Sequence, residues 1–298
     1  MPIFLRRTSA CSEFRERLGQ ANHLLITILI GIEGVRIGDA RKSDDFHAAW
    51  NPKSLEETAQ RSRRFARDAM LNHIVDSLGV YLSLLRSSIY QQALPDLYSI
   101  SDRSLKPRLD AFCSDLGLDV STRLALVHLA IQWRNRRLHT GALNAVEKQY
   151  ETTLKSSMED IRAQFSGLDV GILLAHFAKS ESPRFKEVAS LVKGSLDFIQ
   201  SADTLLVRRL DPSDVARHVI ATTILERAAR NRRRAGQQWG NTPSERQRRL
   251  AGILTTAGFS SESWAGSDQG LPDSFISQLA MLSYSEVLNE FQIDLVSS

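Results

Sequence analysis

The feature that most constrains the fold of this chain is the helical spacing of its apolar residues, which continues over most of its length. The clearest stretch opens at 54–57, where Ser-Leu-Glu-Glu has the pattern of a helix capping box. Apolar side chains then recur three to five residues apart, at Phe65, Ala69, Ile74, Leu78, Leu82 and Leu85. No segment alternates convincingly between apolar and polar residues, and no repeat of fixed period is found. The sequence therefore predicts an all-α protein.

A second helix with a clear apolar stripe is predicted from about Ser121, with Gly141 as its C-terminal stop. Its stripe consists of Leu124, Val127, Ile131, Asn135 and Leu138. The other predicted helices cover about 13–37, 104–116, 146–165, 183–209, 212–234, 244–257 and 272–292. We expect a soft boundary near residues 205–212, with a helical bundle over 1–205 and an accessory helical region over 206–298.

Composition is typical of a soluble globular protein, with 42% hydrophobic and 24% charged residues among 298. Cys11 and Cys113 have no metal-ligand spacing, which favours two reduced thiols. The longest apolar run, Leu24–Ile32, is far shorter than the roughly 20 residues that a membrane-spanning helix needs. We therefore expect a cytoplasmic protein that does not associate with a membrane.

The distribution of charge is more informative than the net charge of +4. Thirty of the basic residues are arginines and eight are lysines, and arginine is suited to gripping phosphates in a fixed geometry. Residues 208–249 hold eleven arginines and four acids, a net of +7, whereas residues 250–298 hold six acids and no base, a net of −6. This asymmetry indicates a nucleic-acid surface beside an acidic segment, or two segments that pair with each other.

Familiar catalytic motifs are absent from the sequence. It contains no glycine-rich phosphate loop, no HExxH or CxxC metal motif and no Gly-x-Ser-x-Gly elbow. We therefore expect no cofactor and no metal. What remains is the stretch Trp133–Gly141, which reads WRNRRLHTG and combines arginines with one histidine. Arginine holds phosphates, and histidine moves protons near neutral pH.

The spacing of Arg134 and His139 does not single out a site, because five of the seven histidines follow an arginine by five or six residues. The residue directly after the arginine distinguishes these pairs. Among the arginines of these five pairs, only Arg134 is followed by an asparagine, Asn135, and its nearest rival is the series Arg67, Asp68, His73. We therefore take Arg134, Asn135 and His139 as the candidate catalytic residues, and expect Trp133 to pack in the core or an interface.

The series Arg134-Asn135-x-x-x-His139, late on a helix of an all-helical chain, resembles the motif of the HEPN superfamily. The resemblance covers at best about residues 12–165. It implies a helical bundle that dimerises with its two motifs facing each other, and a metal-independent endoribonuclease of the toxin–antitoxin or anti-phage kind. Arg134 and His139 would then be catalytic, with Asn135 in support. Some members carry a tyrosine two residues after the histidine, where this chain has Gly141.

Helix geometry adds a reason to expect a dimer. Five residues of a straight helix turn by about 140° and rise by about 7.5 Å, so Arg134 and His139 do not reach one phosphate from one rigid face. Unwinding near 140–141 would bring them together, and so would a second subunit that supplies its own motif. We favour the dimer, because it gathers two arginines and two histidines in one cleft.

The expected function is cleavage of RNA by attack of the ribose 2′-hydroxyl, in a toxin or defence effector that an antitoxin or other regulatory partner restrains. Further arginines are expected to bind RNA: Arg136, Arg137, Arg64, Arg67, Arg232, Arg233 and Arg234. The alternative is a non-catalytic nucleic-acid-binding or regulatory protein that uses the arginine-rich segment 208–249.

Overall fold

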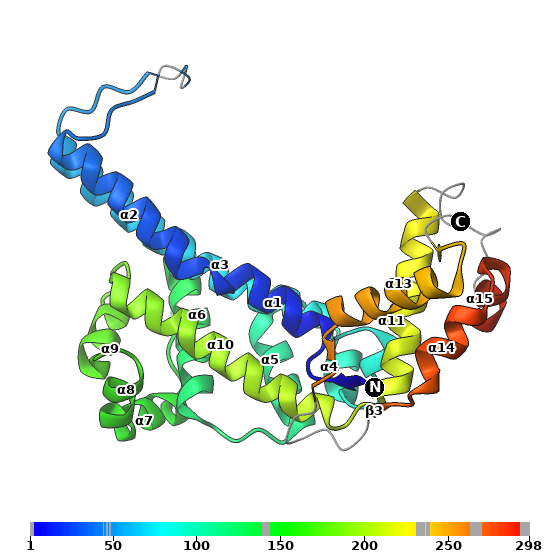
Figure 1. The fold of residues 1–298 in the computed structure, drawn as a ribbon. Coiled ribbons are helices and arrows are strands. Elements are labelled where there is room, and N and C mark those ends of the chain that lie inside the picture. The colour runs from blue at the N-terminus through cyan, green and yellow to red at the C-terminus, as the bar shows by residue number, and fades with distance from the viewer. Residues whose placement is uncertain are drawn as a thin grey trace.

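The computed structural model describes residues 3–43, 45, 47, 49–138, 144–230, 236, 239–262 and 270–292, without the side chains of 227–230. Helices dominate these residues, and the extended elements among them are strands of two or three residues. The prediction of an all-α fold is confirmed. Figure 1 shows a helical body, a long hairpin that projects from it, and a group of helices formed by the C-terminal part of the chain.

The first helical segment is divided into α1 (Ser9–Gly19) and α2 (Ala21–Ile37), where the sequence predicts one helix. Gln20 lies between them with φ −103° and ψ 3°, in the bridge region next to the helical region. The long helix α3 (Leu55–Leu84) returns alongside both and agrees with its predicted bounds. Ser54 caps it, since its hydroxyl accepts a hydrogen bond from the Glu57 amide at 3.2 Å. Helix α2 and the first half of α3 form the projecting hairpin (Figure 1).

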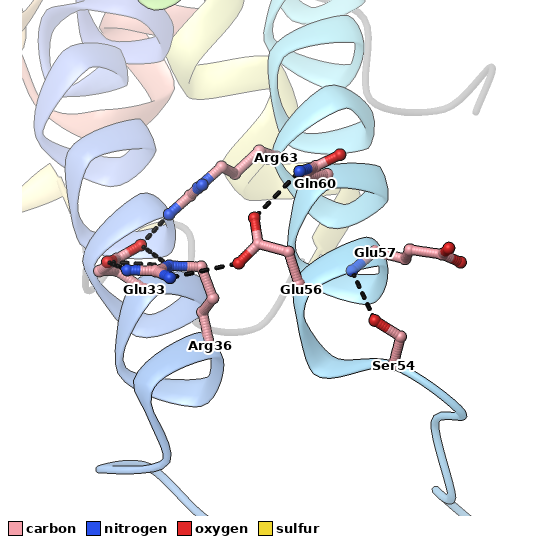
Figure 2. Close-up of polar contacts among 7 residues, drawn as sticks. All are labelled: Glu33, Arg36, Ser54, Glu56, Glu57, Gln60 and Arg63. Carbon is pink, nitrogen blue, oxygen red and sulfur yellow. Dashed lines mark hydrogen bonds and ion pairs between the residues drawn. The ribbon is translucent and has the colours of Figure 1, made fainter.

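A cluster of charged side chains joins the two helices of this hairpin (Figure 2). Arg36 binds Glu33 on its own helix and reaches Glu56 of α3 at 3.2 Å, while Arg63 of α3 binds Glu33. Gln60 donates a hydrogen bond to Glu56 at 2.9 Å. Exposed pairs of this kind contribute about 0.2–1 kcal/mol each, so the cluster aligns the helices more than it stabilises them.

Helix α2 is apolar but mostly exposed, with only Ala21 and Leu25 buried and Ile30 67% exposed. By length and composition, the stretch Ser9–Ile37 is long and apolar enough to cross a membrane. Its first part, α1, packs in the core of the body, where Phe14 and Leu18 are at most 1% exposed. Cytoplasmic location without a membrane stays a prediction.

The main core surrounds α6 (Thr122–Leu138), in which every residue from Leu124 to Trp133 is buried. Helices α3, α5 (Leu105–Leu116) and α10 (Phe185–Val207) pack against it. The short helices η1 (Ser88–Tyr90) and α4 (Pro95–Ser99) lie between α3 and α5. A helix that is apolar on all sides is stable only when surrounded, which explains the central place of α6.

The segment predicted as one helix over 146–165 is divided into α7 (Lys148–Ser156) and α8 (Met158–Gln164). Leu154 and Ile161 on either side of the break are both fully buried, so the apolar spacing continues across it. The sequence does not predict the next helix, α9 (Val170–Ala178). Asp169 caps that helix by accepting a hydrogen bond from the Ile172 amide at 2.9 Å.

A buried polar cluster ties the start of α1 to the main core. The carboxylate of Asp203 on α10 accepts hydrogen bonds from the Thr8 amide at 2.9 Å and the Thr8 hydroxyl at 2.5 Å. The Tyr81 hydroxyl of α3 donates to it at 3.3 Å. Burial raises the pKa of this carboxyl, and the hydrogen bonds from Thr8 and Tyr81 oppose that effect. Three separate elements thus meet at one buried carboxyl.

The C-terminal residues form a second hydrophobic core around four helices: α11 (Pro212–Arg230), α13 (Pro243–Thr256), α14 (Ser274–Met281) and α15 (Tyr284–Glu290). The sequence predicts a single helix where α14 and α15 lie. The buried residues of the main core run to Leu206, and those of the second core include Val207 and, from the N-terminal end, Leu5.

Leu5 belongs to a strand that the sequence pattern does not reveal. Strand β1 (Ile3–Leu5) lies between β2 (Phe259–Ser260) and β3 (Gly270–Leu271) and runs antiparallel to both. Strands of this length are too short to show alternation. Gly258 permits the close approach, because its φ is +102° and a Cβ there would lie 2.1 Å from the carbonyl oxygen of Arg7.

Candidate functional site at the end of helix α6

The last turn of α6 emerges from the core after ten buried residues and carries the predicted motif. Arg134, Asn135, Arg136 and Arg137 are all partly exposed. His139 and Gly141 lie outside the described residues, so the arrangement of Arg134 and His139 stays a prediction. Trp133 is fully buried, as expected, and its indole donates a hydrogen bond to the Glu181 carbonyl at 2.9 Å.

Arg134 and Asn135 lie side by side with weak partners. Arg134 Nη1 donates to Asn135 Oδ1 at 3.3 Å, and Nη2 lies 3.3 Å from Asp76 Oδ1 of α3. Arg134 Nε is buried without a hydrogen-bond partner in the described part of the chain. Asp76 is 66% exposed at its side chain, which weakens the ion pair through solvent screening. The guanidinium is therefore positioned, and its donor capacity for a ligand lies on Nη1 and Nη2, each of which has one long hydrogen bond, and not on the buried Nε.

Arg136 and Arg137, predicted to bind RNA, already hold neighbouring elements. Arg136 donates to the carbonyls of Phe177 and Ala178 at the end of α9, with its guanidinium 4.5 Å from the centre of the Phe177 ring. Arg137 pairs with Asp68 at 2.6 Å and donates to the Ser180 carbonyl at 2.9 Å. Both side chains thus have a structural role, and an RNA contact by them stays a prediction.

The other predicted RNA-binding arginines are placed only in part. Arg64 is exposed on α3, and Arg67 is half-buried with an Nε that has no hydrogen-bond partner among the described residues. Burial lowers the pKa of Arg67. Arg232, Arg233 and Arg234 lie outside the described residues.

The rival series Arg67, Asp68, His73 does not form a second site. Asp68 binds Arg137 and also accepts a hydrogen bond from the Ser182 hydroxyl at 2.8 Å. His73 Nε2 lies 3.0 Å from the Arg17 carbonyl, at the end of α1. These two side chains therefore serve packing between helices.

A pocket of about 700 Å³ opens beside Arg134 and Asn135, within the range of small-ligand sites. Its walls come from α3, the last turns of α6, and the start of α5. Its polar lining consists of Asp76, Ser83, Arg103, Ser104, Lys106, Arg108, Arg134, Asn135 and Asn144. Four cations and one acid belong to this lining, and acids outside it match Lys106, so Arg103, Arg108 and Arg134 are the cations that favour an anionic ligand.

Sequence reasoning missed three of these cations, Arg103, Lys106 and Arg108, which surround the first turn of α5. Lys106 is matched by two acids, Asp110 at 2.6 Å and Glu147 at 2.7 Å. Positive charge at a helix start is unfavourable, because the helix dipole is itself positive there. The basic residues at this helix start were a signal available in the sequence, and the Asp102 carboxylate offsets them by accepting a hydrogen bond from the Ser104 amide at 2.7 Å.

Arg108 is buried, with 8% of its surface exposed. Its Nη2 donates to the Ser83 hydroxyl at 2.8 Å and the Gly79 carbonyl at 3.2 Å, and its Nε has no partner in the described part of the chain. Burial, together with nearby Arg86, lowers the pKa of Arg108, yet an arginine stays charged at neutral pH. No carboxylate among the described residues pairs with it.

A histidine lies behind the pocket wall. His128 of α6 is fully buried, stacks on Tyr150 at 4.1 Å between ring centres, and has Nε2 3.5 Å from Glu147. Burial lowers its pKa, an effect that Glu147 opposes. Glu147 also binds Lys106, so His128 is coupled to the pocket lining through one carboxylate.

Within the ranges that the structure describes, no three His, Cys, Asp or Glu side chains gather as a metal site would require. Metal independence stays a prediction. Comparison of the chain with protein families, with curated proteins and with solved structures found no match.

Proposed function

We propose that the protein is a metal-independent endoribonuclease that acts as a homodimer. The observation that supports this most is the placement of Arg134 and Asn135 side by side on a pocket whose lining also holds Arg103, Lys106 and Arg108. A phosphodiester is the anion that an arginine, an amide and further cations bind through charge-assisted hydrogen bonds. The resemblance of the motif supplies the reaction and the role of His139.

The reaction is a transesterification within one nucleotide. The ribose 2′-oxygen attacks the adjacent phosphorus while its proton passes to a base, and the bond to the 5′-oxygen breaks as that oxygen gains a proton. His139 acts as base or acid in these transfers. Arg134 stabilises the charge that grows on the phosphoryl oxygens. The products end in a 2′,3′-cyclic phosphate and a 5′-hydroxyl, and DNA is not cleaved.

The test is cleavage of end-labelled RNA by purified protein in EDTA, followed by identification of the new ends. We expect cyclic-phosphate ends from the wild type and no cleavage by His139→Ala. His23→Ala is the matched control, because His23 is an exposed histidine that follows Arg17 at nearly the same spacing. Cleavage by His139→Ala at the wild-type rate would reject the assignment.

Retention of RNA without cleavage would instead support the non-catalytic alternative, a nucleic-acid-binding regulator. The biological setting that we propose is a toxin or anti-phage effector restrained by a partner protein. Expression of the wild type should then slow growth of the host, and His139→Ala should relieve this effect.

A further inference from the structure

The projecting hairpin of α2 and α3 (Figure 1) has two different sides. One side carries the charged cluster, in which Glu33 binds Arg63 (Figure 2). The other side holds a groove of about 540 Å³, whose lining includes Ile28, Gly31 and Val35 of α2 and Thr58 and Ser62 of α3. Glu33 lies two residues from both Gly31 and Val35, which is about 160° round the helix. The cluster and the groove therefore face in opposite directions.

Large apolar side chains stand exposed around this groove. Leu24 lies one helical turn before Ile28, and the two are 55% and 49% exposed. Phe65 lies three residues after Ser62, so it belongs to the groove side of α3, and it is 77% exposed. Both helices thus show apolar residues on one side of the hairpin. A side of this kind is the one that packs against further helices in a bundle.

The charge of the hairpin indicates the kind of partner. Residues 21–68 hold eight lysines and arginines and seven acids, a net of +1. A helix that binds a membrane surface is typically rich in lysine and arginine, and a nucleic-acid surface is strongly basic. A nearly neutral side instead suits a nearly neutral partner. A second copy of the hairpin is such a partner, because two of these sides meet without net repulsion.

Contact between identical surfaces requires a projection and a hollow on the same side. Phe65 is the projection. The groove is the hollow, and it is open at Gly31, where an added Cβ would meet no neighbouring atom within 4 Å. Phe65 and Ser62 are about 4.5 Å apart along α3. A twofold axis between them therefore places each Phe65 over the groove of the other copy.

The exposed apolar area is also sufficient for a dimer. A standard interface buries about 800 Å² on each partner, a little more than half of it apolar. A whole aliphatic side chain contributes roughly 100 Å² and an aromatic one roughly 200 Å². Five exposed side chains on or beside the groove then supply on the order of 400 Å² of apolar surface: Leu24, Ile28, Trp50, Leu55 and Phe65.

We propose that the groove side of the hairpin is a dimer surface, on which the hairpin of a second copy packs antiparallel to complete a four-helix bundle. Phe65 of each copy lies in the groove of the other. This inference identifies the contact surface of the proposed homodimer, and no step of it uses the proposed reaction.

The test is sedimentation velocity of the full chain over a range of concentrations, without RNA, which gives the dissociation constant of the dimer. Phe65→Glu charges the projection, and Gly31→Leu fills the hollow. Ile30→Glu is the matched control, because Ile30 is 67% exposed on the same hairpin but lies about 160° round α2 from Ile28. Circular dichroism checks the folding of each variant.

We expect the wild type to sediment at micromolar concentration as a dimer of the 33.4 kDa chain. Phe65→Glu should raise the dissociation constant at least about a hundredfold, because two charges would enter an apolar contact. Gly31→Leu should raise it about tenfold or more, because the new side chain occupies the space of the partner's ring. Phe65→Leu should raise it less than Phe65→Glu, and Ile30→Glu should change it less than about threefold.

A wild type that stays monomeric over this range would overturn the proposal, and so would equal effects of Phe65→Glu and Ile30→Glu. Flotation of the wild type with vesicles of phosphatidylcholine and phosphatidylserine, lost in Phe65→Glu, would assign the groove side to a lipid surface instead. Failure of the proposed function has a different signature. A monomer that cleaves RNA would reject this surface alone, whereas a dimer that leaves RNA intact would reject the reaction alone.

Discussion

Helices α3 and α5 both follow a serine, yet their first turns are opposite in charge. The hydroxyl of Ser54 caps α3, and Glu56 and Glu57 in its first turn favour the helix dipole. Ser104 makes no side-chain cap for α5, whose first turn holds Lys106 and no acid, and the Asp102 carboxylate before the helix accepts a hydrogen bond from the Ser104 amide at 2.7 Å. One helix start thus has a side-chain cap and acids in its first turn, whereas the other has cations there and an acid only before the helix.

The surroundings of the two starts reinforce this difference. Near the start of α3, Glu56 pairs with Arg36 and Gln60 within the hairpin (Figure 2). At the start of α5, Arg103 and Arg108 have no acidic partner among the described residues and face a pocket. Charges that are matched within the chain offer little to an anion, whereas unmatched cations in a concave site attract one.

The largest effect expected from this comparison is on catalysis. Arg134→Gln should lower the rate of RNA cleavage by about 10²–10³, the loss expected when one donor to the transition state is removed. Arg61→Gln, which removes an exposed arginine near the start of α3, should leave the rate unchanged. Single-turnover cleavage assays on both variants check this. An Arg134→Gln protein with half the wild-type rate would show that this arginine is not catalytic.

A smaller effect distinguishes the two serines. Ser54→Ala should lower the free energy of unfolding by about 1 kcal/mol, because a helix cap is lost. Ser104→Ala should change it by less than about 0.5 kcal/mol, since that hydroxyl makes no cap. Urea denaturation of both variants gives the comparison. Equal losses would mean that Ser104 supports its helix as Ser54 does.

A smaller effect still, with the opposite sign, is expected for Arg103→Gln. Removal of this cation should raise the free energy of unfolding by a few tenths of a kcal/mol, because it relieves repulsion from the helix dipole. Thermal unfolding measures this effect. A lowered melting temperature would show that Arg103 does not destabilise the start of α5.

The last predicted effect is a loss of folding stability in acid, which is smallest at neutral pH. Burial lowers the pKa of His128 from its ordinary value of 6.5, so the folded protein excludes a proton that the unfolded chain binds. The stability from neutral His128 is complete above pH 6.5 and is lost as pH falls from 6.5 toward the lowered value. Hydrogen bonds from Gln60 and Arg36 lower the pKa of Glu56 from 4.5, so its contribution is lost only below pH 4.5.

Urea denaturation between pH 7 and pH 5 tests this difference. The wild type should lose stability over this range, at most about 1.4 kcal/mol per pH unit for each proton taken up. His128→Gln should reduce the slope, and His218, whose pKa burial also lowers, should account for part of the remainder. His23→Gln should leave the slope as it is. If the slope of stability against pH for His128→Gln equals that of the wild type, His128 does not contribute to the loss of stability in acid.

Helix content was predictable because local patterns decide it. The cap at Ser54 and the apolar spacing gave α3 its correct bounds. The breaks at Gln20 and Ser157 were not predictable, since apolar spacing continues across both and only the packing of neighbouring helices fixes the bend. Strand β1 was hidden for another reason, because its partners lie at the far end of the sequence.

The candidate site was half predictable. Arg134 and Asn135 stood out as neighbours in the sequence, and the structure places both on the pocket. Arg103 and Arg108 join them only because α5 packs against α3, a contact between residues 25 and 29 positions apart in the case of Arg108. A motif search compares residues that are close in the sequence, so it does not detect a contact between distant segments.

The position of β1 has a consequence for the order in which the parts of the protein fold. Arg6, directly after that strand, pairs with Glu262, 256 residues further on. During synthesis on a ribosome, Ile3, Phe4 and Leu5 are made long before β2 and β3 exist. The closure of so long a loop is entropically costly and slow, so the C-terminal helices complete their core last. Until then, the apolar segment Ile3–Leu5 has no strand partners, and chaperones bind exposed apolar segments of this kind.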